Sequence, residues 1–156
     1  DPECNPVSLS EKGFGIKEEE HLPRIRHVAY NALDPETMLL FYSQVLGLRE
    51  LGTSQERRRQ GRLNRFAGDG STNLAIHPFY SRVEGHEPRF GINHIGFLVP
   101  DLKRSMDDLS SVVAVRSRPA NRPYAESRFR DLEGNALDLS QTKGWEVDID
   151  KWERAA

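Results

Sequence analysis

The fold is decided by residues 91–101, which read GINHIGFLVPD. Residues 92–99 predict a β-strand, because apolar residues dominate the run and Pro100 ends it. Side chains alternate across a strand, so His94 lies on the same face as Gly96, which has no side chain. A single histidine in a strand is more often a hydrogen-bonded structural residue than a metal ligand.

A second stretch, residues 25–34, reads IRHVAYNALD and has the same plan. In both stretches an isoleucine stands two residues before the histidine, a small residue two after it and an aspartate seven after it. A run with helical character follows each time. This internal similarity predicts two copies of one supersecondary unit, with His27 and His94 at matching positions.

Each copy reads as a strand, a helix and three further strands. Asp34 and Asp101 are predicted N-caps, and Pro35 at the first helical position strengthens the first of them. Helical spacing predicts two stripes that pack on the sheet, namely Met38, Phe41, Tyr42 and Val45 in the first copy and Leu102, Met106, Leu109 and Val113 in the second. The later strands are predicted at 48–53, 62–67 and 72–78, and at 113–118, 126–132 and 136–140.

These elements divide the chain into five segments. A polar N-terminal arm (1–22) precedes the first module (23–78), a connector (79–90) leads to the second module (91–141), and a C-terminal tail (142–156) follows.

Composition excludes several classes of protein. The 156 residues are 37% apolar and 29% charged, which is typical of a globular protein. A formal charge of −2 gives no attraction to nucleic acid or to a membrane surface, and no apolar run reaches the ~20 residues of a membrane-spanning helix. Cys4 is the single cysteine, so an internal disulfide is excluded and a reducing, cytoplasmic location is expected.

The last predicted strand adds a carboxylate to the two histidines. Leu137 and Leu139 are predicted to face the helix, so Asp138 points to the opposite face, where His27 and His94 are also expected. Two histidines and one carboxylate suit a divalent transition metal and leave positions open for substrate, water or dioxygen. The ligand types are compatible with iron, zinc, manganese, nickel or cobalt.

Three segments together carry a resemblance to a known family. They are HVAYNALDPETMLLFYSQVLGLREL (27–51), HIGFLVPDLKRSMDDL (94–109) and RDLEGNALDLSQ (130–141). The chain resembles the vicinal oxygen chelate superfamily from about residue 24 to residue 141. That superfamily includes glyoxalase I, methylmalonyl-CoA epimerase, extradiol dioxygenases and the fosfomycin and bleomycin resistance proteins. The resemblance implies an α+β fold in which two βαβββ modules form a cupped, partly open mixed β-sheet barrel with the helices outside, usually as a homodimer.

The resemblance also implies roles for individual residues. The first-strand ligand positions fall on His27 and His94, and a last-strand position falls on Asp138, where glutamate is more usual. The fourth position falls on Ala75, which cannot bind a metal, so the pattern looks more like the three-ligand dioxygenases than the four-ligand glyoxalases. His77 points the same way as Ala75 and is a replacement ligand, a catalytic acid–base group or a plain surface residue. An acid–base role, or a position just outside the ligands, is favoured over ligation. Tyr30 and Tyr124 are the other catalytic candidates.

Three functional hypotheses follow. In the first, the chain is a metalloenzyme (a lyase, an isomerase or a ring-cleaving dioxygenase) whose metal chelates adjacent oxygens of a small-molecule substrate. In the second, it is a metal-free binding or resistance protein of the bleomycin-binding type. In the third, both histidines are structural residues kept by fold ancestry.

Overall fold

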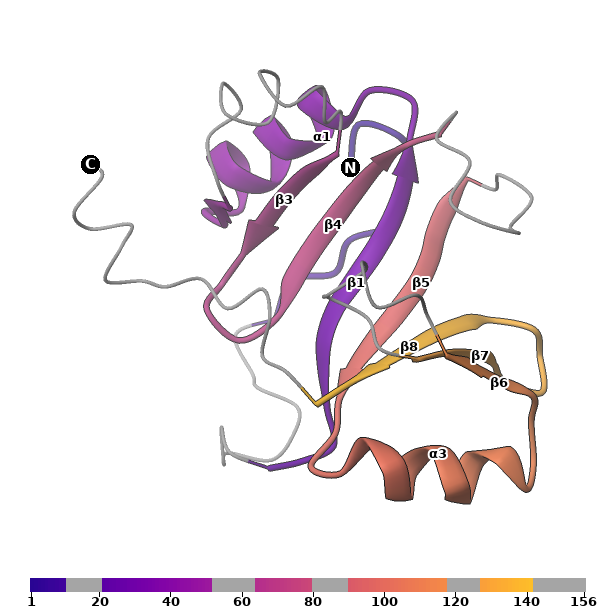
Figure 1. Cartoon of the computed structure of the whole chain (residues 1–156). Coiled ribbons are helices and arrows are strands. Elements are labelled where there is room, and N and C mark those ends of the chain that lie inside the picture. The colour runs from indigo at the N-terminus through magenta and orange to yellow at the C-terminus, as the bar shows by residue number, and fades with distance from the viewer. Residues whose placement is uncertain (11–20, 52–63, 80–89, 118–126, 142–156) are drawn as a thin grey trace.

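The structure, a computed structural model, describes residues 1–10, 21–51, 64–79, 90–117 and 127–141 (Figure 1). Its elements follow in the order β1 (Arg24–Ala32), α1 (Pro35–Leu40), the π-helical turn η1 (Phe41–Val45), β2 (Arg49–Glu50), β3 (Arg65–Gly68), β4 (Asn73–Pro78), β5 (Gly91–Leu98), α3 (Leu102–Ser110), β6 (Val115–Ser117), β7 (Ser127–Arg130) and β8 (Ala136–Ser140).

The strands form one open, mixed sheet in the order β2-β3-β4-β1-β5-β8-β7-β6. The first strand of each module pairs in parallel with the last strand of the same module, β1 with β4 and β5 with β8. The two first strands pair with each other in antiparallel fashion at the centre of the sheet (Figure 1). The order is therefore the same when read from either edge, which confirms the α+β fold of two repeated units that the sequence predicts.

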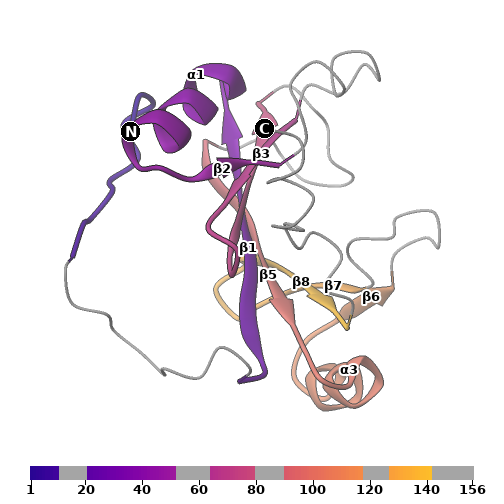
Figure 2. The ribbon, with the colours of Figure 1, turned by 90° about the vertical axis from the view of Figure 1, so that its left-hand side faces the viewer.

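Both helices pack on the same face of the sheet, here called the helix face. Buried Met38 and Leu39 of α1 pack on Ala32 and Ile76. The α3 stripe packs on Leu139 in the second module, as predicted, through Leu102, Met106, Leu109 and Val113. Figure 2 shows α1 and α3 at opposite ends of the sheet. The other face, here called the inner face, carries the polar residues described below and a buried apolar cluster of Ala29, Leu51, Phe66 and Ala75.

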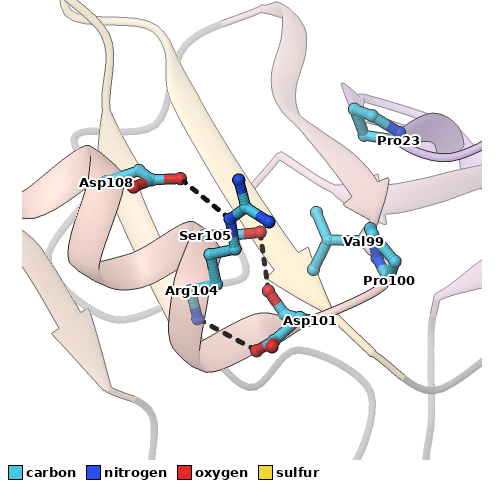
Figure 3. A pocket seen from close by; sticks show the side chains of 7 residues that line it. All are labelled: Pro23, Val99, Pro100, Asp101, Arg104, Ser105 and Asp108. Carbon is cyan, nitrogen blue, oxygen red and sulfur yellow. Dashed lines mark hydrogen bonds and ion pairs between the residues drawn. The ribbon is translucent and has the colours of Figure 1, made fainter.

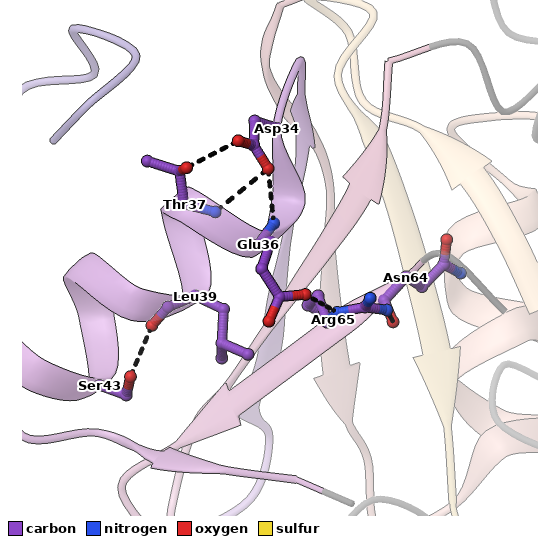
Figure 4. Close-up of polar contacts among 7 residues, drawn as sticks. All are labelled: Asp34, Glu36, Thr37, Leu39, Ser43, Asn64 and Arg65. Carbon is purple, nitrogen blue, oxygen red and sulfur yellow. Dashed lines mark hydrogen bonds and ion pairs between the residues drawn. The ribbon is translucent and has the colours of Figure 1, made fainter. Parts of the chain in front are cut away.

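Helix α1 begins where the sequence predicts (Figure 4). The Asp34 carboxylate accepts hydrogen bonds from the backbone N–H groups of Glu36 and Thr37, which satisfies two donors that the helix itself cannot pair. Glu36 in the first turn also binds the buried guanidinium of Arg65 on β3, with 2.7 Å between Oε2 and Nε. This ion pair fixes the start of α1 against the sheet.

The first helical stripe is predicted correctly for Met38 and Tyr42 but not for Val45, which is 66% exposed. The cause is the π-helical turn η1, which takes more residues per turn than an α-helix and rotates the following positions away from the sheet. Leu39, only 2% exposed, takes the buried place instead.

The edge of the first module also differs from the prediction. Strand β2 covers Arg49–Glu50 rather than 48–53, and β3 begins at Arg65 rather than at residue 62; residues 52–63 lie outside the described part of the chain. Before β1, the Asp1 carboxylate accepts a hydrogen bond from the Tyr42 hydroxyl at 2.9 Å. None of the helices among the described residues is long and apolar enough to cross a bilayer.

Candidate metal centre

The pairing of strands places two of the predicted ligands in one row across the sheet. His27 on β1 lies opposite Gly96 on β5, and Gly96 lies opposite Asp138 on β8. Residues that lie opposite one another in neighbouring strands point to the same face, so the imidazole and the carboxylate project from the inner face on either side of Gly96.

His94 completes the group from the next inward position of β5. Its Nε2 lies 2.9 Å from Nε2 of His27 and 3.2 Å from Oδ2 of Asp138. The two imidazole rings meet edge to face, with their planes at 85°. All three residues are buried, and their ligand atoms lie within 4.8 Å of one another.

The absence of a side chain at Gly96 leaves room for the His27 imidazole. A Cβ atom added to Gly96 would lie 2.0 Å from Cε1 of His27 and 2.3 Å from its Nδ1. Ordinary contacts between such atoms are near 3.5 Å or longer, so any side chain at residue 96 would occupy the space of the ring. The ring therefore lies directly over the β5 backbone, within reach of His94.

The orientation of His94 is set by its neighbour Asn93. The register between β1 and β5 shifts between Ala29 and Tyr30, so that Asn93 is an extra residue in the pairing. Its Oδ1 lies 2.6 Å from Nδ1 of His94, and its Nδ2 donates to Oδ1 of Asn31 at 3.1 Å. If His94 donates an Nδ1 proton to this carbonyl oxygen, it is in the tautomer whose Nε2 lone pair can bind a metal ion.

Burial and neighbouring charges set the protonation of the group. Desolvation, helped by the nearby His94 and Arg26, lowers the pKa of His27 to about 3, so this imidazole is neutral at pH 7. Burial alone would raise the pKa of Asp138, but hydrogen bonds from His94 and Arg128 outweigh it and hold the pKa well below its usual range. Arg128 on β7 approaches through Nε, 2.6 Å from Oδ1.

These residues fit a divalent metal ion. The Nε2 atoms of two imidazoles and an ionised carboxylate converge, and these are donor types that divalent transition metals bind. Two ligand atoms held about 2.1 Å from one ion lie roughly 3 Å apart when they subtend about 90°. The distances of 2.9 Å and 3.2 Å between the ligand atoms agree with that spacing.

His77 on β4 borders this group. Its ring stacks on that of His94, with centroids 6.1 Å apart, and meets Phe66 edge to face at 6.4 Å. Desolvation, helped by His94 and Arg128, lowers the pKa of His77 to about 4. Within the described residues, its buried Nδ1 has no hydrogen-bond partner.

The structure does not bring every predicted site residue to this group. Tyr30 lies at an intervening position of β1, and its ring is 6.4 Å from that of Tyr42, in the core beneath α1. Tyr124 lies outside the described residues. Sequence reasoning missed Asn93 and Arg128, although the alternation of β7 around apolar Phe129 marks Arg128 as a residue of the inner face.

None of these site residues lines the pocket that Figure 3 shows elsewhere on the chain. It lies on the helix face at the N-terminal end of α3, between Pro23, Val99 and the helix. Its polar side chains have partners within the helix, since the Asp101 carboxylate accepts from the Arg104 backbone N–H and the Arg104 guanidinium pairs with Asp108. We therefore assign no function to it.

Comparison with known families supports the repeated architecture. The sequence profile of the glyoxalase/bleomycin resistance protein/dioxygenase superfamily matches residues 24–139, most of the chain and nearly all of both modules. The chain belongs to this superfamily. None of the curated protein sequences matches it.

Solved structures of this superfamily share the fold. The Mn(II)-bound glyoxalase from Novosphingobium aromaticivorans is 20% identical with a TM-score of 0.56 over 88% of this chain and 44% of that chain. The 2,3-dioxygenase LapB from Pseudomonas sp. KL28 is 22% identical with a TM-score of 0.54 over 74% of this chain and 39% of that chain. The methylmalonyl-CoA epimerase from Streptomyces coelicolor is 19% identical with a TM-score of 0.54 over 81% of this chain and 99% of that chain. This chain therefore spans less than half of the first two proteins.

The lowered pKa values predict that the metal-free superfamily member loses stability in mild acid. Below pH 6.5 the unfolded chain binds protons at residues 27 and 77, whereas the folded protein binds them only near pH 3 and pH 4. The free energy of unfolding should therefore fall by about 1.4 kcal/mol per pH unit for each histidine as the pH drops from 6.5 towards 4. Urea unfolding between pH 7.5 and 5 measures this slope.

His77→Gln should reduce the slope by about 1.4 kcal/mol per pH unit, because glutamine does not titrate. His21 is exposed, so His21→Gln is the matched control and should leave the slope unchanged. Equal slopes for His77→Gln and the unsubstituted protein would show that His77 is protonated in the folded state as readily as in the unfolded one.

Proposed function

We propose that this protein is a metal-dependent enzyme of the vicinal oxygen chelate type, glyoxalase-like or extradiol dioxygenase-like, acting on a small molecule. The observation that carries the proposal is the convergence of His27, His94 and Asp138 in one buried group with spacings of 2.9 Å and 3.2 Å. Two imidazole Nε2 atoms beside a carboxylate are a donor set that divalent transition metals bind.

The three side chains would hold a divalent transition metal, with Fe, Zn, Mn, Ni and Co all compatible with the ligand types. When bound, such an ion supplies Lewis-acid stabilisation of the negative charge that develops on two adjacent substrate oxygens. His27 and His94 contribute neutral donors, and Asp138 contributes one negative charge. Asn93 keeps the His94 lone pair aimed at the centre of the group.

His77 is the residue that we assign to proton transfer. With a pKa of about 4 it is neutral at pH 7, so it can accept a proton from a substrate carbon or hydroxyl but does not arrive protonated. The stacking of its ring on that of His94 supports a role beside the metal ligands. The same group serves proton abstraction next to a carbonyl and deprotonation of a catecholic hydroxyl.

A metal-free binding protein of the bleomycin-resistance type is the second candidate. The observation that favours it is the ion pair of Arg128 with Asp138, whose two oxygens lie 2.6 Å and 3.2 Å from Nε and Nη2. A guanidinium in this position already offsets the carboxylate charge, so Asp138 has a partner without a metal.

The proposal also extends to the assembly and organisation of the chain. It includes a cytoplasmic homodimer whose subunits each contain two modules, 23–78 and 91–141, with an arm before them and a tail after them. Size-exclusion chromatography with light scattering measures the subunit number.

Metal analysis separates the two candidates. The purified protein should bind one equivalent of a transition metal, and Mn²⁺ or Zn²⁺ at about a hundred times its Kd should raise the free energy of unfolding by about 2.7 kcal/mol. Elemental analysis after dialysis gives the stoichiometry, and thermal unfolding gives the stabilisation. Absence of both effects with Fe²⁺, Mn²⁺ and Zn²⁺ would reject the enzyme and favour the binding protein.

A further inference from the structure

Arg128 holds a fixed place at the edge of the candidate metal centre. It lies directly opposite Asp138 in the pairing of β7 with β8, and its side chain is 13% exposed. Nε donates to Oδ1 of Asp138 at 2.6 Å and Nη2 donates to Oδ2 at 3.2 Å, a two-point contact that fixes the plane of the guanidinium. A guanidinium carries five N–H donors, and within the described residues Nη1 makes no hydrogen bond.

The charges around the centre do not balance once a divalent cation is present. Among the described residues, Asp138 is the one carboxylate in the group with His27 and His94, and both of its oxygens contact the guanidinium of Arg128. The negative charge of Asp138 is thus already matched by Arg128, and within the described residues no second carboxylate joins the group to offset the charge of the cation. A buried, uncompensated charge is strongly unfavourable, so a bound ligand has to supply negative charge.

We infer that the substrate is an anion in which one of the two chelating oxygens belongs to a carboxylate, as in 2-hydroxy- and 2-oxo-carboxylates, and that Arg128 stabilises this carboxylate. The inference rests on the proposed metal-dependent function and names its substrate class. Arg128 keeps its contact with Asp138 through Nε and Nη2, and Nη1 is the donor that remains for the ligand. A neutral substrate would add no negative charge beside the cation.

Lactate and lactamide form a matched pair of probes, because they have the same size and the same adjacent oxygens and differ in charge. Calorimetric titration of the Mn²⁺-loaded protein should give a Kd for lactate at least about a hundredfold lower than for lactamide. In Arg128→Gln the ratio of the lactamide Kd to the lactate Kd should fall by about ten- to hundredfold, the usual effect of one charge-assisted hydrogen bond. The Kd for lactamide should stay unchanged. Arg128→Lys should keep the charge but lose the two-point contact, and should give an intermediate ratio.

Arg130→Gln is the control, because Arg130 lies two residues further along β7, is exposed and donates to the carbonyl of Gly134. The ratio of the lactamide Kd to the lactate Kd in Arg130→Gln should equal that of the unsubstituted protein.

Metal content is measured for every sample. A protein that binds no metal rejects the proposed function, whatever the probes show. A metal-loaded protein that binds both probes equally, or an Arg128→Gln variant with full metal content and an unchanged ratio, overturns the anionic substrate and leaves the proposed function intact. If Arg128→Gln loses its metal, Arg128→Lys decides: an intermediate ratio supports the inference and an unchanged ratio overturns it.

Discussion

His94→Ala is expected to lower the affinity of the protein for Mn²⁺ or Zn²⁺ on the order of a thousandfold. His94 is the member of the group that contacts both others, with Nε2 2.9 Å from His27 and 3.2 Å from Asp138. Metal sites with a few protein ligands bind with roughly 10–16 kcal/mol in total, so each ligand accounts for several kcal/mol. Competition with a chelator of known affinity measures the change, and circular dichroism shows whether the fold persists.

A graded series tests whether the loss comes from ligation itself. Asn93→Leu leaves the His94 ring in place but removes the acceptor of its Nδ1 proton, and should lower metal affinity by about ten- to a hundredfold. His77→Ala should leave the metal affinity within a few-fold of the unsubstituted value, because this ring stacks on His94 without facing its Nε2. Full metal content in His94→Ala would show that the ion, if one binds, is held elsewhere.

The sequence predicts part of this centre through two features, the alternation of side chains along a strand and the internal repeat. Two histidines with the same flanking pattern predict matching strands, and alternation around Leu137 and Leu139 predicts the direction of Asp138. The sheet order then shows a consequence of the repeat: His27 lies opposite Gly96, and His94 lies opposite Ala29, the matching small residue of the other module. Each histidine thus uses the space that a small residue leaves on the other strand.

The same matching explains why the last strand of the second module supplies a carboxylate to the centre and the last strand of the first module does not. Gly96 lies opposite Asp138 in the second module, and Ala29 lies opposite Ala75 in the first. Ala75 is therefore the structural counterpart of Asp138, as the family resemblance implies, and it carries no donor atom.

Features that depend on register or on pairing could not be predicted from the pattern. The extra residue Asn93 in β5 interrupts the period of two, and a single sequence does not reveal where a bulge falls. The role of Arg128 follows from its position opposite Asp138 in the neighbouring strand. Tyr30 is a catalytic candidate in the sequence, but its odd separation from His27 along β1 directs it to the helix face.

Gly96→Ala is expected to abolish metal binding although residue 96 has no ligand atom. The new methyl group would lie 2.0–2.7 Å from three atoms of the His27 ring, so the ring must rotate away or β1 and β5 must separate. We expect metal affinity to fall as far as in His27→Ala, and the free energy of unfolding to fall by about 1–3 kcal/mol from overpacking. Chelator competition and urea unfolding measure the two effects.

The double variant Gly96→Ala/His27→Ala isolates the steric cause. If the clash with the imidazole is responsible, removal of the ring makes the methyl group harmless, and the double variant should be about as stable as His27→Ala alone. The two stability losses would then fail to add, by about the 1–3 kcal/mol that Gly96→Ala costs on its own. Additive losses would instead place the strain in the β5 backbone. Glycine would then be required at residue 96 for a reason other than the position of the His27 ring. Metal binding should stay absent in the double variant in either case, because the first histidine of the group is gone.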